Sequence, residues 1–324
     1  MLSRFNFAFI LFVLVSNFIY GVFSSTVIFA AGVGAGVGER NKRDHVKIAA
    51  GSILEGYYFI GLKLCRYISE SNNGIRCEVV PTSGSLENIG LLHNGEVDFA
   101  FSQGNLAVDA YNGKGYFLES EPFKDMVQLL RLHDDAFTVI VKDKDKIMLF
   151  GDLDGKKISN GPKNSDSTIT YVALSAYYDF KKEPEDIEMS HEDYAKNFCN
   201  GKIDAIIMMT GHPNALVNYI THTCESDFIS VESDKIDMLV KQNPAFKRYI
   251  IDHTDYPGIN RSEQTVAAST IFVTSKSVPK QLIANLMAHF KERIEQFKQT
   301  DPLLYDLEEK HFTSDFVLPG FVFD

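Results

Sequence analysis

Five short groups of small polar residues each follow a predicted strand, and their side chains have the chemistry to hold a small solute. The groups span residues 51–52, 82–85, 102–103, 164–168 and 210–214. Each group alone is explained as a helix cap. Strand ends and helix N-termini meet at one edge of an open parallel sheet. The five groups together therefore predict a cleft that holds a carboxylate-bearing solute through hydroxyls, amides and backbone N–H groups.

Larger side chains are candidates for the same cleft. Tyr57 and Tyr58 lie near the start of a predicted helix, where one can face the cleft while the other packs on the sheet. Two core tyrosines are the alternative. Arg131 lies on a long extended stretch and has the geometry to bind a carboxylate. An internal ion pair with Asp134 or Asp135 is the favoured interpretation of Arg131.

The elements that position these residues alternate between short apolar strands and helices. Strands are predicted at 46–51, 77–81 and 97–102, with helices over 53–71 and 85–94 between them. A second α/β series begins near residue 150, and a single helix of about 20 residues is predicted within 278–299. The alternation predicts a parallel sheet with right-handed crossovers.

Two extended stretches divide the predicted fold into two lobes. Residues 126–143 form the first crossing between the lobes, and residues 264–276 return to the first lobe. Lobe 1 is predicted from residues 46–137 and 270–324, and lobe 2 from residues 138–269. The predicted fold class is therefore α/β with two lobes, and the cleft between them is the expected ligand site.

The start of the chain has the pattern of an export signal. Arg4 precedes an apolar run that extends to about Phe23, so residues 1–25 are predicted to be a cleaved signal peptide. An uncleaved membrane anchor is the alternative. Residues 26–45 are predicted to be a flexible leader, because their glycines do not match a dinucleotide-binding pattern. The protein is therefore expected in the periplasm.

Charge and motif content exclude several classes of function. The net charge of −11 and the lack of a basic run argue against nucleic acid and anionic lipid as partners. The sequence has no G-x-S-x-G or C-x-x-C motif, so no enzymatic activity is predicted. Its Cys and His spacings match no zinc pattern, so no metal or cofactor is predicted either.

The four cysteines allow two disulfides in an oxidising compartment. Cys65 with Cys77 and Cys199 with Cys224 are the pairs that would each stay within one lobe. Four buried thiols are the alternative that the sequence leaves open.

Several blocks of sequence follow one another in the order found in a known family. They are AAGSILEGYYFIG, PTSGSLENIGLL, HNGEVDFAFSQGNLAVDAYNGKGYF, DLDGKKISNGPKNSDST, GKIDAIIMMTGHPNALV and DYPGINRSEQTVAAS. The first resembles an opening Gly-Ser with a Tyr-Tyr pair, and the second resembles a Thr-x-Gly-Ser-x-x-Asn motif. Over about residues 47–301 the chain resembles the TAXI solute-binding proteins, the extracytoplasmic receptors of one branch of tripartite ATP-independent periplasmic (TRAP) transporters.

The resemblance implies a type II periplasmic-binding fold that closes on a small organic acid, such as glutamate or a related dicarboxylate. The receptor would deliver this ligand to the TRAP permease subunits in the membrane. The polar strand ends and the matching motifs together predict ligand contacts at Ser52, Tyr57, Tyr58, Thr82, Gly84, Ser85, Asn88, Gln103, Ser165, Ser167, Thr168, Gly211 and Pro213.

The chain departs from the family pattern in three places. Glu55 replaces a Gly, Asn105 replaces an Asp, and Ser165-Asp166-Ser167 stands in place of Ser-Gly-Thr. Such changes in charge near the site bear on the identity of the ligand more than on the fold. A ligand-sensing or host-exposed immunogenic surface protein on the same fold is the alternative function, and a periplasmic hydrolase is a less favoured one.

Overall fold

The computed structural model describes residues 45–53, 56–71, 75–142, 146–313 and 317–320. The predicted signal peptide and all of the predicted leader except His45 lie outside the described residues, as does Glu55. Among the residues that are described, no helix combines the length and apolar character needed to cross a bilayer.

The first lobe begins with three strands that alternate with helices, as the sequence predicts. These elements are β1 (His45–Ala49), α1 (Gly56–Ser71), β2 (Arg76–Val80), α2 (Ser85–His93), β3 (Phe99–Gln103), α3 (Gly104–Asn112) and the short η1 (Gly115–Phe117). Strand β1 lies between β2 and β3 and is parallel to both. The carboxyl ends of these strands therefore share one edge of the sheet.

The second lobe repeats the alternation of strands and helices. Its elements are η2 (Phe150–Leu153), β5 (Lys157–Ser159), α4 (Asp166–Ser175), β6 (Glu185–Asp186), α5 (His191–Cys199), β7 (Ala205–Thr210), α6 (Ala215–Thr223), β8 (Asp227–Phe228), α7 (Ser233–Gln242), β9 (Phe246–Ile251) and η3 (His253–Asp255). Strand β5 pairs in parallel with both β6 and β7.

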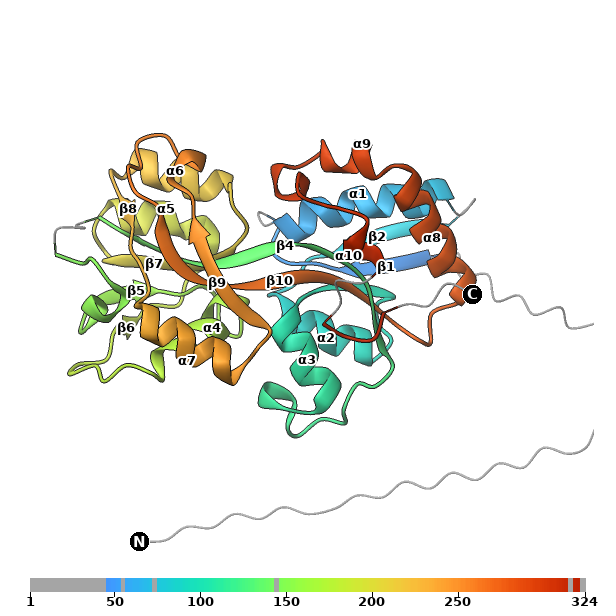
Figure 1. Cartoon of the computed structure of the whole chain (residues 1–324), viewed down its shortest axis with the longest axis horizontal. Helices are drawn as coiled ribbons and strands as arrows, with labels where there is room; N and C mark the ends of the chain where they lie inside the picture. Colours follow the sequence, from blue (N-terminus) through green and yellow to red (C-terminus); the bar gives the residue numbers. More distant parts are fainter. Residues whose placement is uncertain (1–44, 54–55, 72–74, 143–145, 314–316, 321–324) are drawn as a thin grey trace, which may run out of the picture. The chain divides into compact units, whose positions relative to one another are not determined.

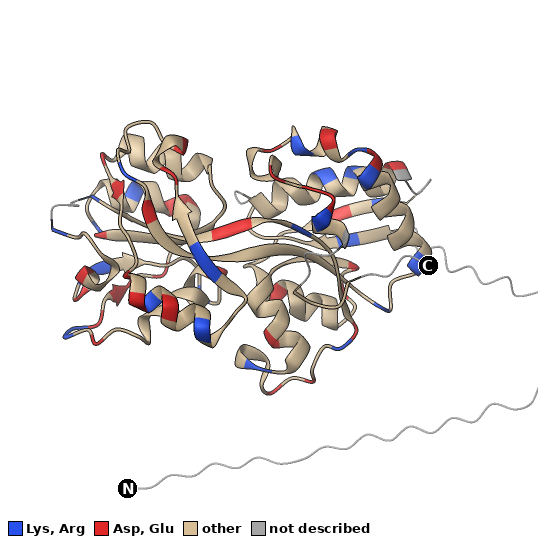
Figure 2. Ribbon diagram, viewed as in Figure 1, with Lys and Arg blue, Asp and Glu red and all other residues tan. Residues whose placement is uncertain are grey.

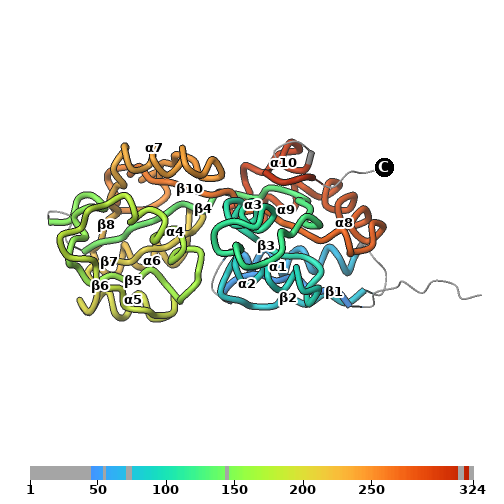
Figure 3. The backbone as a smooth tube through the Cα atoms, turned by 90° about the horizontal axis from the view of Figure 1, so that it is seen from below, coloured from blue at the N-terminus to red at the C-terminus, as the bar shows by residue number. Residues whose placement is uncertain are grey.

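Two long strands, β4 (Met126–Val141) and β10 (Glu263–Ser275), take part in both lobes. They pair with each other in antiparallel fashion, and Figures 1 and 3 show them side by side. The sheet order is β2-β1-β3-β10-β4-β7-β5-β6. The sheet is therefore mixed rather than parallel throughout, because each crossing strand runs against its neighbours. The predicted lobe boundaries at 137–138 and 269–270 fall inside these two strands.

Helices cover both faces of the sheet in each lobe (Figure 1). In the first lobe, α1 and α8 (Lys280–Glu292) pack on one face, and α2 and α3 pack on the other. In the second lobe, α4 and α7 cover one face, and α5 and α6 cover the other. Burial on both faces explains why the strands are nearly continuous apolar runs.

The C-terminal segment differs from the single helix that the sequence predicts. Helix α8 ends at Glu292, and a short α9 (Ile294–Lys298) follows it. Arg293 separates the two with φ −117° and ψ 18°, outside helical geometry. The break lets Phe297 pack at 4.4 Å, between ring centroids, against Phe290. The chain continues through η4 (Pro302–Leu304) and α10 (Lys310–Thr313).

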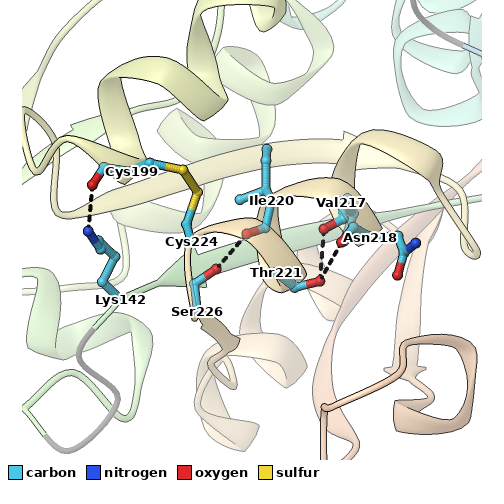
Figure 4. Close-up of a disulfide and its surroundings, with 8 residues drawn as sticks. All are labelled: Lys142, Cys199, Val217, Asn218, Ile220, Thr221, Cys224 and Ser226. Carbon is cyan, nitrogen blue, oxygen red and sulfur yellow. Dashed lines mark hydrogen bonds between the residues drawn. A yellow bond between two sulfur atoms is a disulfide. The ribbon is translucent and has the colours of Figure 1, made fainter.

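Both cysteine pairs form disulfides, so the alternative of four buried thiols does not hold. Cys65 in α1 is bonded to Cys77 in β2, with 5.1 Å between their Cα atoms. Cys199 at the end of α5 is bonded to Cys224 after α6, with 4.9 Å between Cα atoms (Figure 4). Lys142 Nζ donates a hydrogen bond to the carbonyl of Cys199 beside this second disulfide.

Candidate functional site

A small cavity lies where the two lobes meet. Its lining residues are Gly56, Tyr57, Ser83, Gly84, His133, Asp135, Ser165, Asp166, Ser167, Met209, Thr210, Gly211 and Leu303. They come from the starts of α1, α2 and α4, the middle of β4, the end of β7 and the short η4 (Pro302–Leu304). The cavity volume is about 30 Å³, which is room for a few water molecules.

The structure brings part of the predicted site together at this cavity. Tyr57, Gly84, Ser165, Ser167 and Gly211 line it, and Ser85 adjoins it through Asp166. The other predicted residues do not line it: they are Ser52, Tyr58, Thr82, Asn88, Gln103, Thr168 and Pro213. Of the tyrosine pair, Tyr57 therefore faces the cleft, while Tyr58 packs against the core of the first lobe.

A buried carboxylate forms the centre of the cavity wall. Asp135 is 4% exposed and accepts hydrogen bonds from Tyr57 Oη at 2.7 Å and Thr270 Oγ1 at 2.9 Å. His133 Nε2 lies 3.1 Å from its second oxygen. Burial by itself raises the pKa of Asp135, but His133 and these hydroxyl donors outweigh it and hold the pKa below its usual value.

A second carboxylate joins the two lobes directly. Asp166, the first residue of α4, accepts hydrogen bonds from Ser85 N at 3.0 Å and Ser85 Oγ at 2.7 Å. Helix α2 has no side-chain cap of its own, because its N-cap residue is Gly84. Asp166 therefore caps α2 from the opposite lobe. Gly84 has φ 128°, and a Cβ there would lie 3.3 Å from Asp166 Oδ1.

The predicted hydroxyls of the second lobe hold α4 in place. Ser165 is the N-cap of α4, and its Oγ accepts a hydrogen bond from Thr168 N. Ser167 Oγ accepts a hydrogen bond from Met209 N at 2.8 Å, which ties α4 to β7. These contacts fix the position of Asp166 between them.

Asn88 and Gln103 have roles that the motif did not reveal. Asn88 Nδ2 donates to the carbonyls of Ala50 and Phe101, so its amide joins α2 to β1 and β3. Gln103 is fully buried, and its backbone N–H donates to Ser85 Oγ at 2.9 Å. Among the described residues its side-chain amide has no hydrogen-bond partner. Both residues support the start of α2 rather than line the cavity.

Arg131 forms the internal ion pair that the sequence favours. Its Nη2 lies 2.7 Å from Asp134 Oδ1, and its Nε donates to Ser269 Oγ at 2.9 Å. Lys247 also pairs with Asp134, at 2.5 Å. Asp134 and Asp135 therefore belong to two separate networks. Figure 2 shows acidic residues, in red, in the middle of β4. No Lys or Arg occurs among the described residues that line the cavity.

Leu303 is a part of the site that sequence reasoning missed. Its side chain lies between the lobes, 3.1 Å from where a Cβ of Gly56 would be and 2.6 Å from that of Gly211. Beyond it lies a second cavity of about 410 Å³, which includes Phe59, Pro213 and Pro302 in its lining and shares Gly56 and Leu303 with the first. Only the glycines at 56 and 211 hint at this close approach.

Two α/β lobes, two crossing strands and a polar cavity at their junction define the two-lobed periplasmic-binding-protein fold. A model of the NMT1-like family matches residues 48–319, so the chain belongs to the NMT1-like family.

Solved structures with similar folds share little sequence with this chain. The alkanesulfonate-binding protein SsuA from Xanthomonas axonopodis pv. citri, bound to MOPS, is 14% identical at a TM-score of 0.45, covering 81% of this chain and 74% of its own. The substrate-binding protein of an amino acid ABC transporter is 14% identical at a TM-score of 0.46, covering 81% and 100%. A histidine kinase sensor domain with similarity to periplasmic binding proteins is 11% identical at a TM-score of 0.49, covering 82% and 98%.

Proposed function

We propose that this protein is an extracytoplasmic solute receptor of the TAXI type. It captures a small organic acid, such as glutamate or a related dicarboxylate, and delivers it to the membrane subunits of a TRAP transporter. It acts by binding alone and catalyses no reaction. The observation that carries the proposal is the cavity between the lobes, which both lobes line with hydroxyls and helix N-termini.

The start of α2 supports an acid as the ligand. Ser85 presents a backbone N–H and a hydroxyl that already bind the two oxygens of one carboxylate, that of Asp166. The same two donors suit the carboxylate of a solute. The two disulfides support export, because disulfides persist in oxidising compartments such as the periplasm.

A thermal-shift screen of the purified protein against amino acids and dicarboxylates tests the proposal. A ligand present at 100 times its dissociation constant adds about 2.7 kcal/mol of stability, and for a chain of this size we expect a rise in Tm of about 5 °C or more. We expect the ligand-dependent rise to shrink in Ser85→Ala. Ser226→Ala removes another buried serine hydroxyl, which lies after α6 near the Cys199–Cys224 disulfide, and should keep the full ligand-dependent rise in Tm. If no amino acid or dicarboxylate raises Tm, the proposed function is wrong.

A further inference from the structure

We infer that Asp166 is a tethered stand-in for the carboxylate of the solute, so that an acid binds only by displacing it from Ser85. This inference rests on the proposed function and makes Asp166 the residue that sets the affinity for acids. The position is occupied by a group of the right chemistry, and the group belongs to the protein itself.

The geometry is that of a bound anion rather than of an ordinary helix cap. Both oxygens of Asp166 are used, one by the backbone N–H of Ser85 and one by its hydroxyl. The carboxylate reaches α2 from the other lobe, 81 residues away in sequence. Helix α4, where Asp166 resides, already has its own cap in Ser165. Asp166 is therefore not the cap of its own helix.

The surroundings of this contact indicate that it occupies space meant for a solute. Gly84 leaves room for the carboxylate, since a Cβ would press on Asp166 Oδ1. With Asp166 in place the cavity has only about 30 Å³, whereas small-molecule sites have about 300–1,000 Å³. A solute must therefore separate Asp166 from Ser85 before it can enter.

A second observation at the same cavity points to a solute. His133 lines the cavity, its side chain is 6% exposed, and its Nδ1 has no hydrogen-bond partner among the described residues. A buried polar atom without a partner is costly unless something binds it. A solute that displaces Asp166 would bring polar atoms close to the ring of His133.

Displacement lowers the affinity for the acid, because the hydrogen bonds that the acid gains from Ser85 are the ones that Asp166 loses. Deleting the competing carboxylate removes this loss. Asp166→Ala keeps a residue that favours helix at the first position of α4. Asp234→Ala is the matched control, because Asp234 lies in the first turn of another lobe 2 helix, its side chain is 64% exposed, and it forms a surface ion pair with Lys235.

Isothermal titration with glutamate and with succinate compares the wild type, Asp166→Ala and Asp234→Ala, and small-angle scattering follows each protein without added acid. We expect Asp166→Ala to bind at least one of the two acids at least tenfold more tightly than the wild type. We also expect its radius of gyration to be larger, because the two hydrogen bonds between the lobes are gone. Asp234→Ala should match the wild type in both measurements.

Unchanged affinity in Asp166→Ala would overturn the inference. Weaker binding would overturn it too, because Asp166 would then contact the solute directly. If none of the three proteins binds an acid, the proposed function fails, and scattering alone decides the role of Asp166. In that case an unchanged radius of gyration overturns the role of Asp166. A larger radius in Asp166→Ala alone shows that the hydrogen bonds between Asp166 and Ser85 hold the two lobes together.

Discussion

The two neighbouring tyrosines at the start of α1 provide a matched test of the buried network. Tyr57 Oη donates a hydrogen bond to Asp135 at 2.7 Å, and burial followed by the charges of Asp135 and Asp166 raises the pKa of Tyr57 well above its usual value. The Tyr57 hydroxyl therefore keeps its proton and can donate a hydrogen bond to Asp135. Among the described residues, the hydroxyl of Tyr58 has no such partner, and its ring lies edge-on to Phe59.

Replacing Tyr57 by Phe removes one donor to a buried carboxylate. Hydrogen bonds to charged groups contribute about 1.5–3 kcal/mol. Thr270 and His133 still contact Asp135 in the variant, so a value near the middle of this range is expected. We predict that Tyr57→Phe lowers the free energy of unfolding by about 2 kcal/mol at pH 7. Tyr58→Phe should change it by less than about 0.5 kcal/mol.

The pH dependence of this loss has a definite sign. The pKa of Asp135 is lowered in the folded protein, so its stabilising effect is present above the unfolded pKa of about 3.9 and is lost as pH falls through the folded value. Losing the Tyr57 donor shifts the folded pKa of Asp135 upward. The difference in stability between the wild type and Tyr57→Phe should therefore be full at pH 7 and shrink as the pH drops below about 4.

Urea denaturation of the wild type and both variants, at pH 7 and in steps down to the acid limit of folding, measures these differences. Equal losses for Tyr57→Phe and Tyr58→Phe would refute the role given to the hydroxyl. A Tyr57→Phe loss that stays constant through acid pH would refute the role given to the charge of Asp135.

Three further predictions concern other buried groups. Replacing both Cys199 and Cys224 by Ser opens a loop of 25 residues and should cost about 3–4 kcal/mol, measured by urea denaturation; no loss would contradict it. Burial lowers the pKa of His212 to about 4, so NMR should find its ring neutral down to that pH, and stability should fall as pH drops from about 6.5 to 4. A midpoint near 6.5 would disprove this. Asn88→Ala removes two buried hydrogen bonds, to the carbonyls of Ala50 and Phe101, and should lower the free energy of unfolding by about 2–4 kcal/mol in urea denaturation. A negligible change would contradict this structural role.

Local patterns in the sequence predicted much of the fold. Apolar runs and the polar residues that follow them located β1, β3, α2 and both crossing strands. The sequence did not predict that β4 and β10 run antiparallel to their neighbours. The residue pattern of a strand is the same whether its neighbours are parallel or antiparallel. The break at Arg293 was missed as well, since the apolar spacing continues across it and the packing of Phe297 decides it.

The site was harder to read than the fold for a related reason. Motif positions such as Thr82 and Asn88 are near the cavity in sequence, yet their side chains are used to hold the start of α2. The partners that shape the cavity are remote from one another along the chain. Asp166 meets Ser85 from 81 residues away, and Leu303 reaches Gly56 and Gly211 from the C-terminal segment. Pair contacts of this kind leave little trace in a single sequence.

The two crossing strands, β4 and β10, also connect the two lobes, so a hinge motion between the lobes would bend this pair of strands. A two-stranded ribbon resists stretching along its length, but it bends where its ladder is irregular. The ladder between β4 and β10 is irregular between Ser269 and Ile271, and Thr270, the residue between them, donates its hydroxyl to Asp135. Thr270 therefore belongs both to the irregular part of the ladder and to the hydrogen-bond network around Asp135. Bending the ribbon at this point would change the geometry of that hydrogen bond.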